Sequence, residues 1–298
     1  MIFRAPQNYI FIGEKNIFYA SVKKNKKNKF KIEKKLQREI PQGILSSGKI
    51  VRKNQFIDFI KRINKKFNMK GGSVKFILPD NLVGNKFFQV PAMSKSGIND
   101  YLEVEAERIS DFSLNETVVD YSIVGKDEKN INLHLATVEK DLIIDYQEVI
   151  WKTFKKCQGI TFRADATWPV LSQICGNEKI ILLELHENIT YISAASRNQT
   201  YLYWQNFQTI NTLERMQQTI KEVDKYLEQE MNLEIIKKIY IWDTRKKKIE
   251  FPQLNAGHNW INLNLDDLNL SLDKSFIEFY NLNTDYFLPL LGMIIRDL

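Results

Sequence analysis

The sequence predicts an α/β fold of two lobes. The chain has 298 residues, of which 44% are hydrophobic and 12% aromatic, which is enough to bury a large core and argues against disorder. A hairpin near Tyr9 is followed by further strands and helices, and the same order of elements starts again near Ile180. This repeat of hairpin, strand and helix is typical of a chain that forms two similar α/β halves.

The first elements expected are a hairpin and a helix. Residues 9–22 are rich in β-branched and aromatic side chains on both sides of a turn at residues 13–16, which predicts two strands. A helix is expected at residues 53–67, because apolar residues recur there at helical spacing and Gly71-Gly72 follows. Its apolar stripe consists of Phe56, Ile60, Ile63 and Phe67.

The segment at residues 74–124 combines several structural signals. The run VKFIL is closed by Pro79, and the run KFFQVP ends at Pro91, where a strand loses an amide donor. After Ser94, apolar residues recur at helical spacing, and TVVDYSIV then returns to an extended pattern. The expected order is strand, strand, helix, strand.

Strands and helices alternate in the rest of the chain. The strand INLHLATV leads into a helix at about residues 140–154, and its histidine, His134, is expected to be structural. Residues 179–192 are expected to begin the second hairpin. Residues 210–231 carry an apolar stripe over six turns, which predicts a helix that covers one face of a sheet.

These motifs resemble the PilM family of type IV pilus assembly proteins. The resemblance rests on LPD, VPAMS and VVDYSIV in that order, with an acidic helix before the last, and on LLGMIIR near the C-terminus, which is similar to the family's final helix. It implies an actin-like (ribonuclease H-like duplicated) two-lobe fold. Residues 1–161 are then expected to form the first lobe, with an inserted subdomain at about residues 74–138, and residues 162–298 the second.

The resemblance also implies a nucleotide site, whose motifs are altered in this chain. Family members have an Asp-Ile-Gly type of turn in each hairpin, where this chain has FIG and ELH, and a glycine-rich loop where this chain has DTRK. Metal and phosphate need a carboxylate and small residues that let backbone amides approach. The degenerate positions are Phe11, Gly13, Glu184, His186 and Asp243. We therefore expect no cofactor, no metal and no catalytic residue; the alternative is an ATP-binding protein or ATPase with a divergent site.

A peptide partner is the main expectation that the resemblance supports. PilM-like proteins bind the short cytoplasmic N-terminal segment of a PilN-like inner-membrane protein as an extended peptide in a groove of the first lobe, which requires no catalytic residue. Other pilus platform components are further expected partners. The acidic side chains Glu103, Glu105 and Glu107 suit a basic tail. The groove is expected to be lined by Phe76, Leu78, Phe88, Val90 and Met93.

Positive charge is concentrated at the beginning of the chain. Residues 1–70 hold 19 Lys and Arg against 4 Asp and Glu, whereas the remaining 228 residues hold 24 against 32. The basic run at residues 23–35 is interpreted as a solvated hairpin, with an anionic membrane surface or a nucleic acid as alternative contacts. Because no RNA- or DNA-binding signature accompanies it, nucleic acid is not expected as a partner.

The remaining features predict the location of the protein. No apolar run approaches the roughly 20 residues that span a bilayer, and the first residues lack the pattern of a signal peptide. The two cysteines, Cys157 and Cys175, have no metal-binding spacing and are expected to be reduced. We expect a cytoplasmic protein, peripheral at the inner face of the cytoplasmic membrane.

Overall fold

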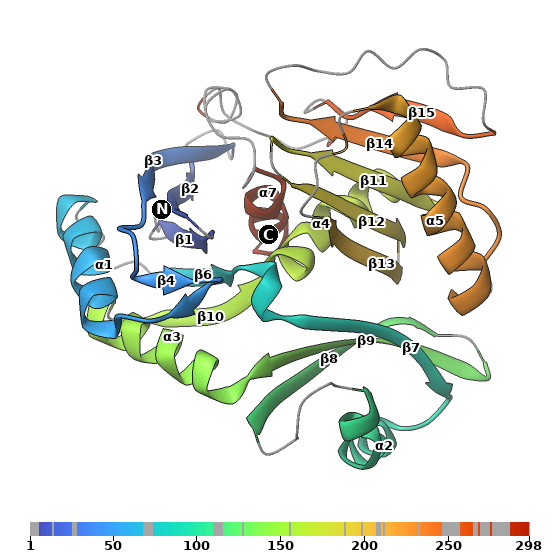
Figure 1. The fold of residues 1–298 in the computed structure, drawn as a ribbon, viewed down its shortest axis with the longest axis horizontal. Helices are drawn as coiled ribbons and strands as arrows, with labels where there is room; N and C mark the ends of the chain where they lie inside the picture. Colours follow the sequence, from blue (N-terminus) through green and yellow to red (C-terminus); the bar gives the residue numbers. More distant parts are fainter. Residues whose placement is uncertain are drawn as a thin grey trace.

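The described residues form two five-stranded sheets, one three-stranded sheet and one two-stranded hairpin, with helices between and around them (Figure 1). The structure is a computed structural model. It describes residues 6–13, 15–25, 29–67, 74–109, 116–126, 128–154, 156–187, 189–197, 199–206, 210, 212–231, 233–245, 257–264, 268, 275 and 287–297.

The first five-stranded sheet has the order β10-β6-β1-β2-β3. Its strands are β1 (Gln7–Ile12), β2 (Asn16–Lys24), β3 (Phe30–Glu39), β6 (Val74–Leu78) and β10 (Cys157–Phe162). Strands β1, β2 and β3 are antiparallel, whereas β6 and β10 run parallel to β1. The predicted first hairpin is confirmed, and the Gly13 amide closes its turn by donating to the Asn16 carbonyl at 2.8 Å.

Helices α1 (Lys53–Phe67) and α3 (Lys140–Thr153) cover one face of the first sheet. The helix expected at residues 53–67 is confirmed, and Phe56, Ile60 and Ile63 of its stripe are buried. A short hairpin, β4 (Leu45–Ser46) and β5 (Lys49–Ile50), precedes α1. Its turn residues Ser47 and Gly48 both have positive φ, at 47° and 80°, the conformation of a tight two-residue hairpin turn.

The second five-stranded sheet repeats the arrangement of the first, with the order β13-β12-β11-β14-β15. Its strands are β11 (Ile180–Leu185), β12 (Thr190–Ser196), β13 (Gln199–Asn206), β14 (Lys238–Asp243) and β15 (Asn259–Asn262). Again three antiparallel strands are followed by two parallel ones. Helix α5 (Leu213–Met231) covers one face, with Met216, Ile220, Val223 and Leu227 buried against the sheet.

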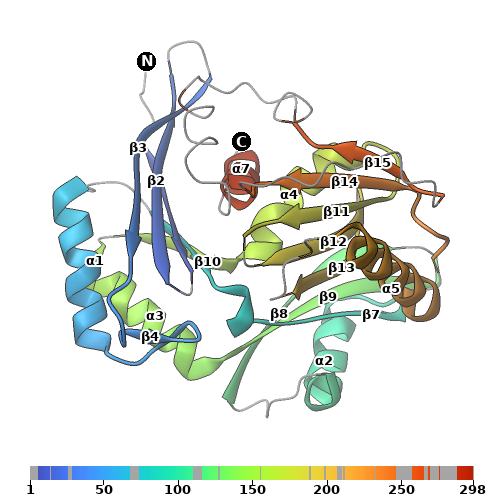
Figure 2. The same cartoon turned by 45° about the horizontal axis from the view of Figure 1, so that its top comes forward.

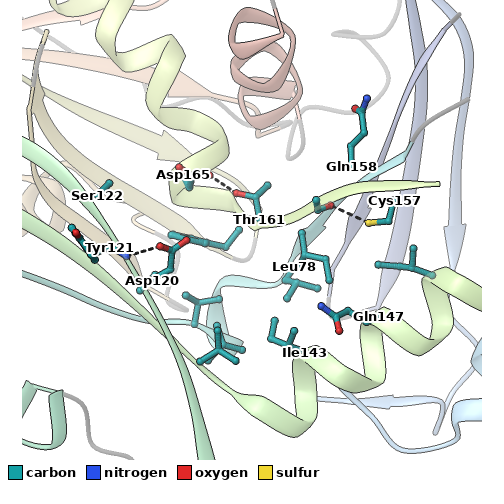
Figure 3. A pocket seen from close by; sticks show the side chains of 18 of the residues that line it. Leu78, Asp120, Tyr121, Ser122, Ile143, Gln147, Cys157, Gln158, Thr161 and Asp165 are labelled. Carbon is teal, nitrogen blue, oxygen red and sulfur yellow. Dashed lines mark hydrogen bonds between the residues drawn. The ribbon is translucent and has the colours of Figure 1, made fainter. Parts of the chain in front are cut away.

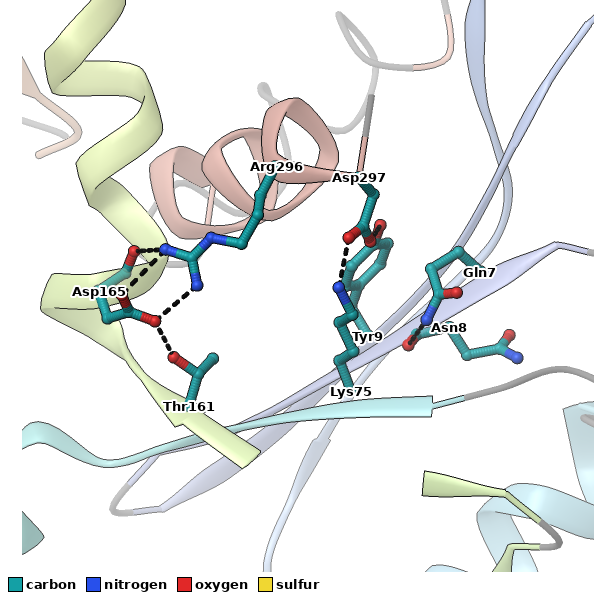
Figure 4. Close-up of polar contacts among 8 residues, drawn as sticks. All are labelled: Gln7, Asn8, Tyr9, Lys75, Thr161, Asp165, Arg296 and Asp297. Carbon is teal, nitrogen blue, oxygen red and sulfur yellow. Dashed lines mark hydrogen bonds and ion pairs between the residues drawn. The ribbon is translucent and has the colours of Figure 1, made fainter. Parts of the chain in front are cut away.

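Two helices, α4 (Arg163–Cys175) and α7 (Phe287–Arg296), lie between the two large sheets (Figure 2). They share one apolar cluster with side chains of both sheets, in which the rings of Trp242 and Phe287 stack at 5.7 Å between centroids. The end of α7 is also tied by polar contacts (Figure 4): Arg296 binds Asp165 of α4, and Asp297 accepts a hydrogen bond from the Tyr9 hydroxyl at 2.8 Å. The α7 helix therefore joins both halves of the molecule.

The three-stranded sheet, called the small sheet below, has the order β7-β9-β8 and is antiparallel. Its strands are β7 (Gly84–Pro91), β8 (Thr117–Lys126) and β9 (Asn130–Glu139), and α2 (Lys95–Ile109) packs on one face. A short 3-10 helix, η1 (Asp80–Leu82), leads from β6 into this sheet. The expected insertion at residues 74–138 begins too early, because β6 pairs with β1 and β10 inside the first sheet and the small sheet starts only at Gly84. The division of the chain after residue 161 stays a prediction.

Candidate functional site

A groove with a volume of about 540 Å³ lies between the small sheet, β10 and α3 (Figure 3). It is open to solvent and is lined by both polar and apolar side chains. From β8 and β9 come Val118, Asp120, Tyr121, Ser122, His134, Ala136 and Val138; from α3 come Ile143, Gln147, Ile150 and Trp151; and β10 contributes all six of its residues, with Asp165 at the start of α4.

The small sheet presents one of its two faces to the groove. Successive side chains of a strand point to opposite faces, so every second residue reaches the same side. Ser122 lies opposite His134 and Asp120 opposite Ala136 in the paired strands β8 and β9, and all four line the groove. The intervening residues Leu133 and Leu135 are fully buried against α2 on the other face. The sheet thus separates its own core from the groove.

The wall formed by α3 is mainly apolar and includes one exposed tryptophan. Ile143, Gln147 and Trp151 recur at intervals of four residues and therefore share one side of the helix. Trp151 has 72% of its surface exposed, although large aromatic side chains are usually covered. On β8, Val118 is 40% exposed at the groove. Exposed apolar side chains that gather along one groove mark a site where another molecule binds.

Two sheet edges border the groove. Among the described strands, β10 is the last of the first sheet and pairs with β6, and β8 is the last of the small sheet and pairs with β9. Each strand therefore has backbone amides and carbonyls on its outer side that no neighbouring strand of its sheet binds. An extended peptide can form main-chain hydrogen bonds to such an edge.

The charged side chains of the groove are acidic. The Asp165 carboxylate is bound by Arg296 at 2.6 and 3.0 Å and accepts a hydrogen bond from Thr161 (Figure 4). Asp120 is exposed on β8, and one of its oxygens accepts the Tyr121 amide at 2.8 Å. A carboxylate in this exposed position can pair with a basic side chain of a ligand.

His134 and Cys157 are both uncharged in the groove. Burial lowers the pKa of His134 to about 4, although nearby Asp165 acts in the opposite direction, and the ring stacks on Phe87 with 4.4 Å between centroids. Burial also raises the pKa of the Cys157 thiol, which donates to the Gly159 carbonyl at 3.6 Å. The expectation that His134 is structural agrees with this apolar, stacked position.

The five residues expected to line a groove do not lie together. Phe76 and Leu78 belong to the core beneath α1 and α3, and only Leu78 also reaches the groove. Phe88, Val90 and Met93 pack between the small sheet and α2, on the sheet face that is turned away from the groove. These five side chains therefore do not line one groove, because the strand's alternation sends Phe87 and Phe88 to opposite faces. Their contact with a partner peptide stays a prediction. The side chains of Glu103, Glu105 and Glu107 lie outside the described residues.

The altered positions of the first hairpin belong to the core. Phe11 is 2% exposed and its ring packs 5.8 Å from that of Phe18, within the cluster that α4 and α7 share with both large sheets. Gly13 forms the turn of the hairpin. An aromatic side chain in this position fills space between the sheets with apolar surface.

The altered positions of the second hairpin form a buried polar network. Arg163 donates to Glu184 at 2.5 Å and lies 3.9 Å over the Tyr191 ring, and both charged side chains are nearly inaccessible. Burial raises the pKa of the Glu184 carboxyl, but the charge of Arg163 and the contacts to His186 outweigh it, so its pKa lies below the ordinary value. His186 Nδ1 lies 2.8 Å from the Thr244 hydroxyl.

The Asp243 carboxylate is also neutralised within the chain. Arg245 binds its two oxygens at 2.9 and 2.5 Å and donates to the Ile210 carbonyl at 2.5 Å. The sequence alone did not identify Arg163 or Arg245 as partners of these acids. Arg245 stands two residues after Asp243, which was a usable signal, whereas Arg163 meets Glu184 only through the fold.

This chain is similar to a known family in sequence and to known proteins in structure. Residues 10–155 match the family model described as type IV pilus assembly protein PilM. None of the curated proteins matches the chain in sequence. A chain of the PilM-PilN type IV pilus biogenesis complex matches in structure with a TM-score of 0.74 and 14% identity, covering 98% of this chain and 98% of that one.

A second solved structure with a similar fold is the cytoplasmic domain of EpsL, an inner membrane component of the type II secretion system of Vibrio cholerae. It has a TM-score of 0.54 and 8% identity, with 89% of this chain and 92% of that one covered. These matches confirm the expected two-lobe, actin-like fold class. Among the helices of the described residues, none combines the length and the apolar character needed to cross a membrane. Within the same residues, no group of three or more His, Cys, Asp or Glu side chains is placed to hold a metal ion.

Proposed function

We propose that this PilM-like chain is a scaffold of type IV pilus assembly that binds the N-terminal cytoplasmic tail of a PilN-like inner-membrane protein in the groove. The observation that carries the proposal is the position of the groove between two sheet edges, with Trp151 exposed on the third wall. The structural match to a chain of a PilM-PilN complex over nearly the whole length supports it.

The groove suits an extended peptide in its dimensions and its chemistry. A segment of about six residues in β conformation matches the length of β10 and gains main-chain hydrogen bonds along either edge strand. Its apolar side chains contact Trp151, Ile143 and Val118, and a basic side chain pairs with Asp120. Cytoplasmic flanks of membrane spans are commonly rich in Lys and Arg, which fits that carboxylate. We expect a dissociation constant of micromolar order, which corresponds to a binding free energy of roughly −8 kcal/mol.

The proposed scaffold performs no catalysis and binds no nucleotide or metal. Metal coordination needs a carboxylate that is free to bind a cation, but Glu184 is neutralised by Arg163 and Asp243 by Arg245. Phosphate binding needs backbone amides that a ligand can approach closely, but the ring of His186 is buried at the second hairpin and the ring of Phe11 beside the first. The residues present therefore do not fit a magnesium-nucleotide complex.

The same proposal places the protein at the inner face of the cytoplasmic membrane, held there by its membrane-anchored partner. Other platform components are then expected to contact surfaces outside the groove. Nucleic acid has no role in this proposal.

The experiment is a co-purification of the chain with a full-length PilN-like protein from the same organism, followed by cross-linking and peptide mapping. Cross-links between the tail and residues of β8, α3 or β10 are the expected result. Cross-links confined to the second sheet, or co-purification that survives deletion of the tail, contradict the proposal.

A further inference from the structure

The outer face of α1 is basic and uncovered. Lys61, Arg62, Lys65 and Lys66 are all exposed, and at 100° per residue they lie within one side of the helix, opposite the buried Phe56, Ile60 and Ile63. Lys34 of β3 joins them, because its ammonium donates to the Phe67 carbonyl at the end of α1. These five residues are called the α1 basic face.

The α1 basic face is poor in compensating acids. The acid of α1, Asp58, lies on this same face, three residues before Lys61 and four before Arg62, so five basic side chains stand against one acid. Within the described part of the chain the ion pairs of α1 involve Lys53, at the other end of the helix. The imbalance reflects the chain as a whole, since residues 1–70 carry an excess of 15 positive charges and the rest an excess of 8 negative ones. A local cluster of this kind attracts an extended anionic surface.

Helix α3 connects this face to the groove. Lys53 of α1 binds Asp145 and Glu148 on one side of α3, at 2.6 and 2.7 Å, while Ile143 and Trp151 line the groove on another side. Figures 1 and 2 both show α1 on the outside of the first sheet, with no described element beyond it. A molecule bound in the groove and a surface in contact with α1 thus occupy neighbouring sides of one helix pair.

We infer that the α1 basic face contacts the anionic phospholipid headgroups of the bilayer in which the groove's partner is anchored. This inference deepens the proposed function and rests on it for the identity of the membrane. An exposed helix face with lysine and arginine matches headgroups, to which each charge contributes roughly fivefold in affinity. Binding of nucleic-acid single strands would call for exposed aromatic rings among the charges. Among the residues that the structure describes, the exposed aromatic side chain is Trp151, which lies in the groove instead.

The basic run at residues 23–35 contributes less to this contact than its composition indicates. Lys23 forms an ion pair with Glu33, and Lys24 lies 5.1 Å over the Phe30 ring. Residues 26–28 lie outside the described residues. Lys23 and Lys24 are therefore engaged within the hairpin, whereas the charges of α1 and Lys34 lie at the end of the neighbouring helix.

The test is flotation of the whole chain with vesicles of neutral phosphatidylcholine and with vesicles that also contain phosphatidylglycerol, without any tail peptide. The variant Lys61→Glu/Lys65→Glu reverses two charges on the α1 basic face. Its matched control is Lys221→Glu/Lys225→Glu, which makes the same change at the same spacing on the exposed side of α5. We expect recovery with anionic vesicles alone, at least tenfold weaker binding for the α1 variant, and unchanged binding for the control.

Three results overturn the inference: equal recovery with neutral and anionic vesicles, equal losses in the two variants, or release from the vesicles by duplex DNA at equal phosphate concentration. Raising the salt from about 0.1 to about 1 M shortens the screening length from about 10 to about 3 Å and is expected to release the protein. Tail binding, measured by titrating the wild type and the α1 variant with tail peptide, separates the two proposals. Flotation without tail binding in the wild type contradicts the proposed function alone, and normal tail binding without flotation contradicts this inference alone.

Discussion

Gly292 of α7 meets the backbone carbonyl of Ala166 of α4 so closely that a Cβ atom on Gly292 would lie 1.9 Å from that oxygen. No other residue type fits this helix crossing without moving one of the helices, because real Cβ contacts are never this short. The two helices lie between the large sheets and share their apolar cluster, so this contact sets the spacing at the centre of the molecule.

Gly292→Ala is therefore expected to destabilise the fold by about 3 kcal/mol, the upper part of the range for overpacked cores. Urea denaturation followed by circular dichroism measures the change. Gly159→Ala is the matched control, since nothing lies within 4 Å of a Cβ at that position. Equal stability of the two variants would contradict the helix crossing described here.

Acidification is expected to destabilise the small sheet through His134. The pKa of this side chain is lowered from 6.5 to about 4 by burial, so the neutral form is favoured in the folded state and protonation favours the unfolded state. The stability that the neutral His134 side chain contributes is fully present above pH 6.5 and is lost as the pH falls toward 4. In His134→Phe, which keeps a ring against Phe87, this loss is absent.

The free energy of unfolding of the wild type should therefore fall relative to His134→Phe between pH 6.5 and 4, by a difference on the order of 3 kcal/mol. Chemical denaturation of both proteins across this range gives the value. A constant difference between them at all pH values would mean that His134 does not titrate with a lowered pKa.

Trp151→Ala is expected to weaken tail binding with little effect on stability, because 72% of the tryptophan surface is exposed in the free protein. Loss of a large aromatic contact at an interface typically costs about 2 kcal/mol, or roughly thirtyfold in affinity. Calorimetric titration with the tail peptide measures it. Ile235→Ala, which removes another exposed apolar side chain away from the groove, is expected to bind like the wild type.

Magnesium-ATP is expected to give no binding heat at micromolar protein concentration. The acids that remain at the altered turns are already paired, Glu184 with Arg163 and Asp243 with Arg245. Calorimetry in the presence and absence of magnesium is the measurement. Micromolar affinity would restore the alternative of an ATP-binding protein with a divergent site.

Much of the fold was predictable from local patterns. The stripe from Phe56 to Phe67 and the stripe that runs on from Met216 to Leu227 each define one buried helix face, and Pro79 stands directly after strand β6 as expected. The C-terminal motif LLGMIIR became a helix whose glycine is needed for a close contact. The spacing of apolar residues and the positions of proline and glycine carry this information, because each depends on a few neighbouring residues.

The groove was not predictable in the same way. The run KFFQVP is apolar on both faces, so its pattern does not say whether Phe87 or Phe88 packs against α2; the structure places Phe88 there. Trp151 looked like an ordinary helix residue, and its exposure depends on the position of β10 and the small sheet. The pairing of Arg163 with Glu184 likewise joins an element that follows the first sheet to one in the second.

Alkylation of Cys157 tests the central claim, that the tail binds in the groove, most directly. Cys157 lines the groove and is partly exposed, whereas Cys175 is buried with its pKa raised to about 12 and serves as an internal control. Both thiols are followed by mass spectrometry in the wild-type protein, with and without the tail peptide at saturating concentration. We predict that the tail slows labelling of Cys157 at least tenfold, while Cys175 stays unreactive in both samples; a tail that binds by calorimetry and leaves the labelling rate of Cys157 unchanged would contradict the account.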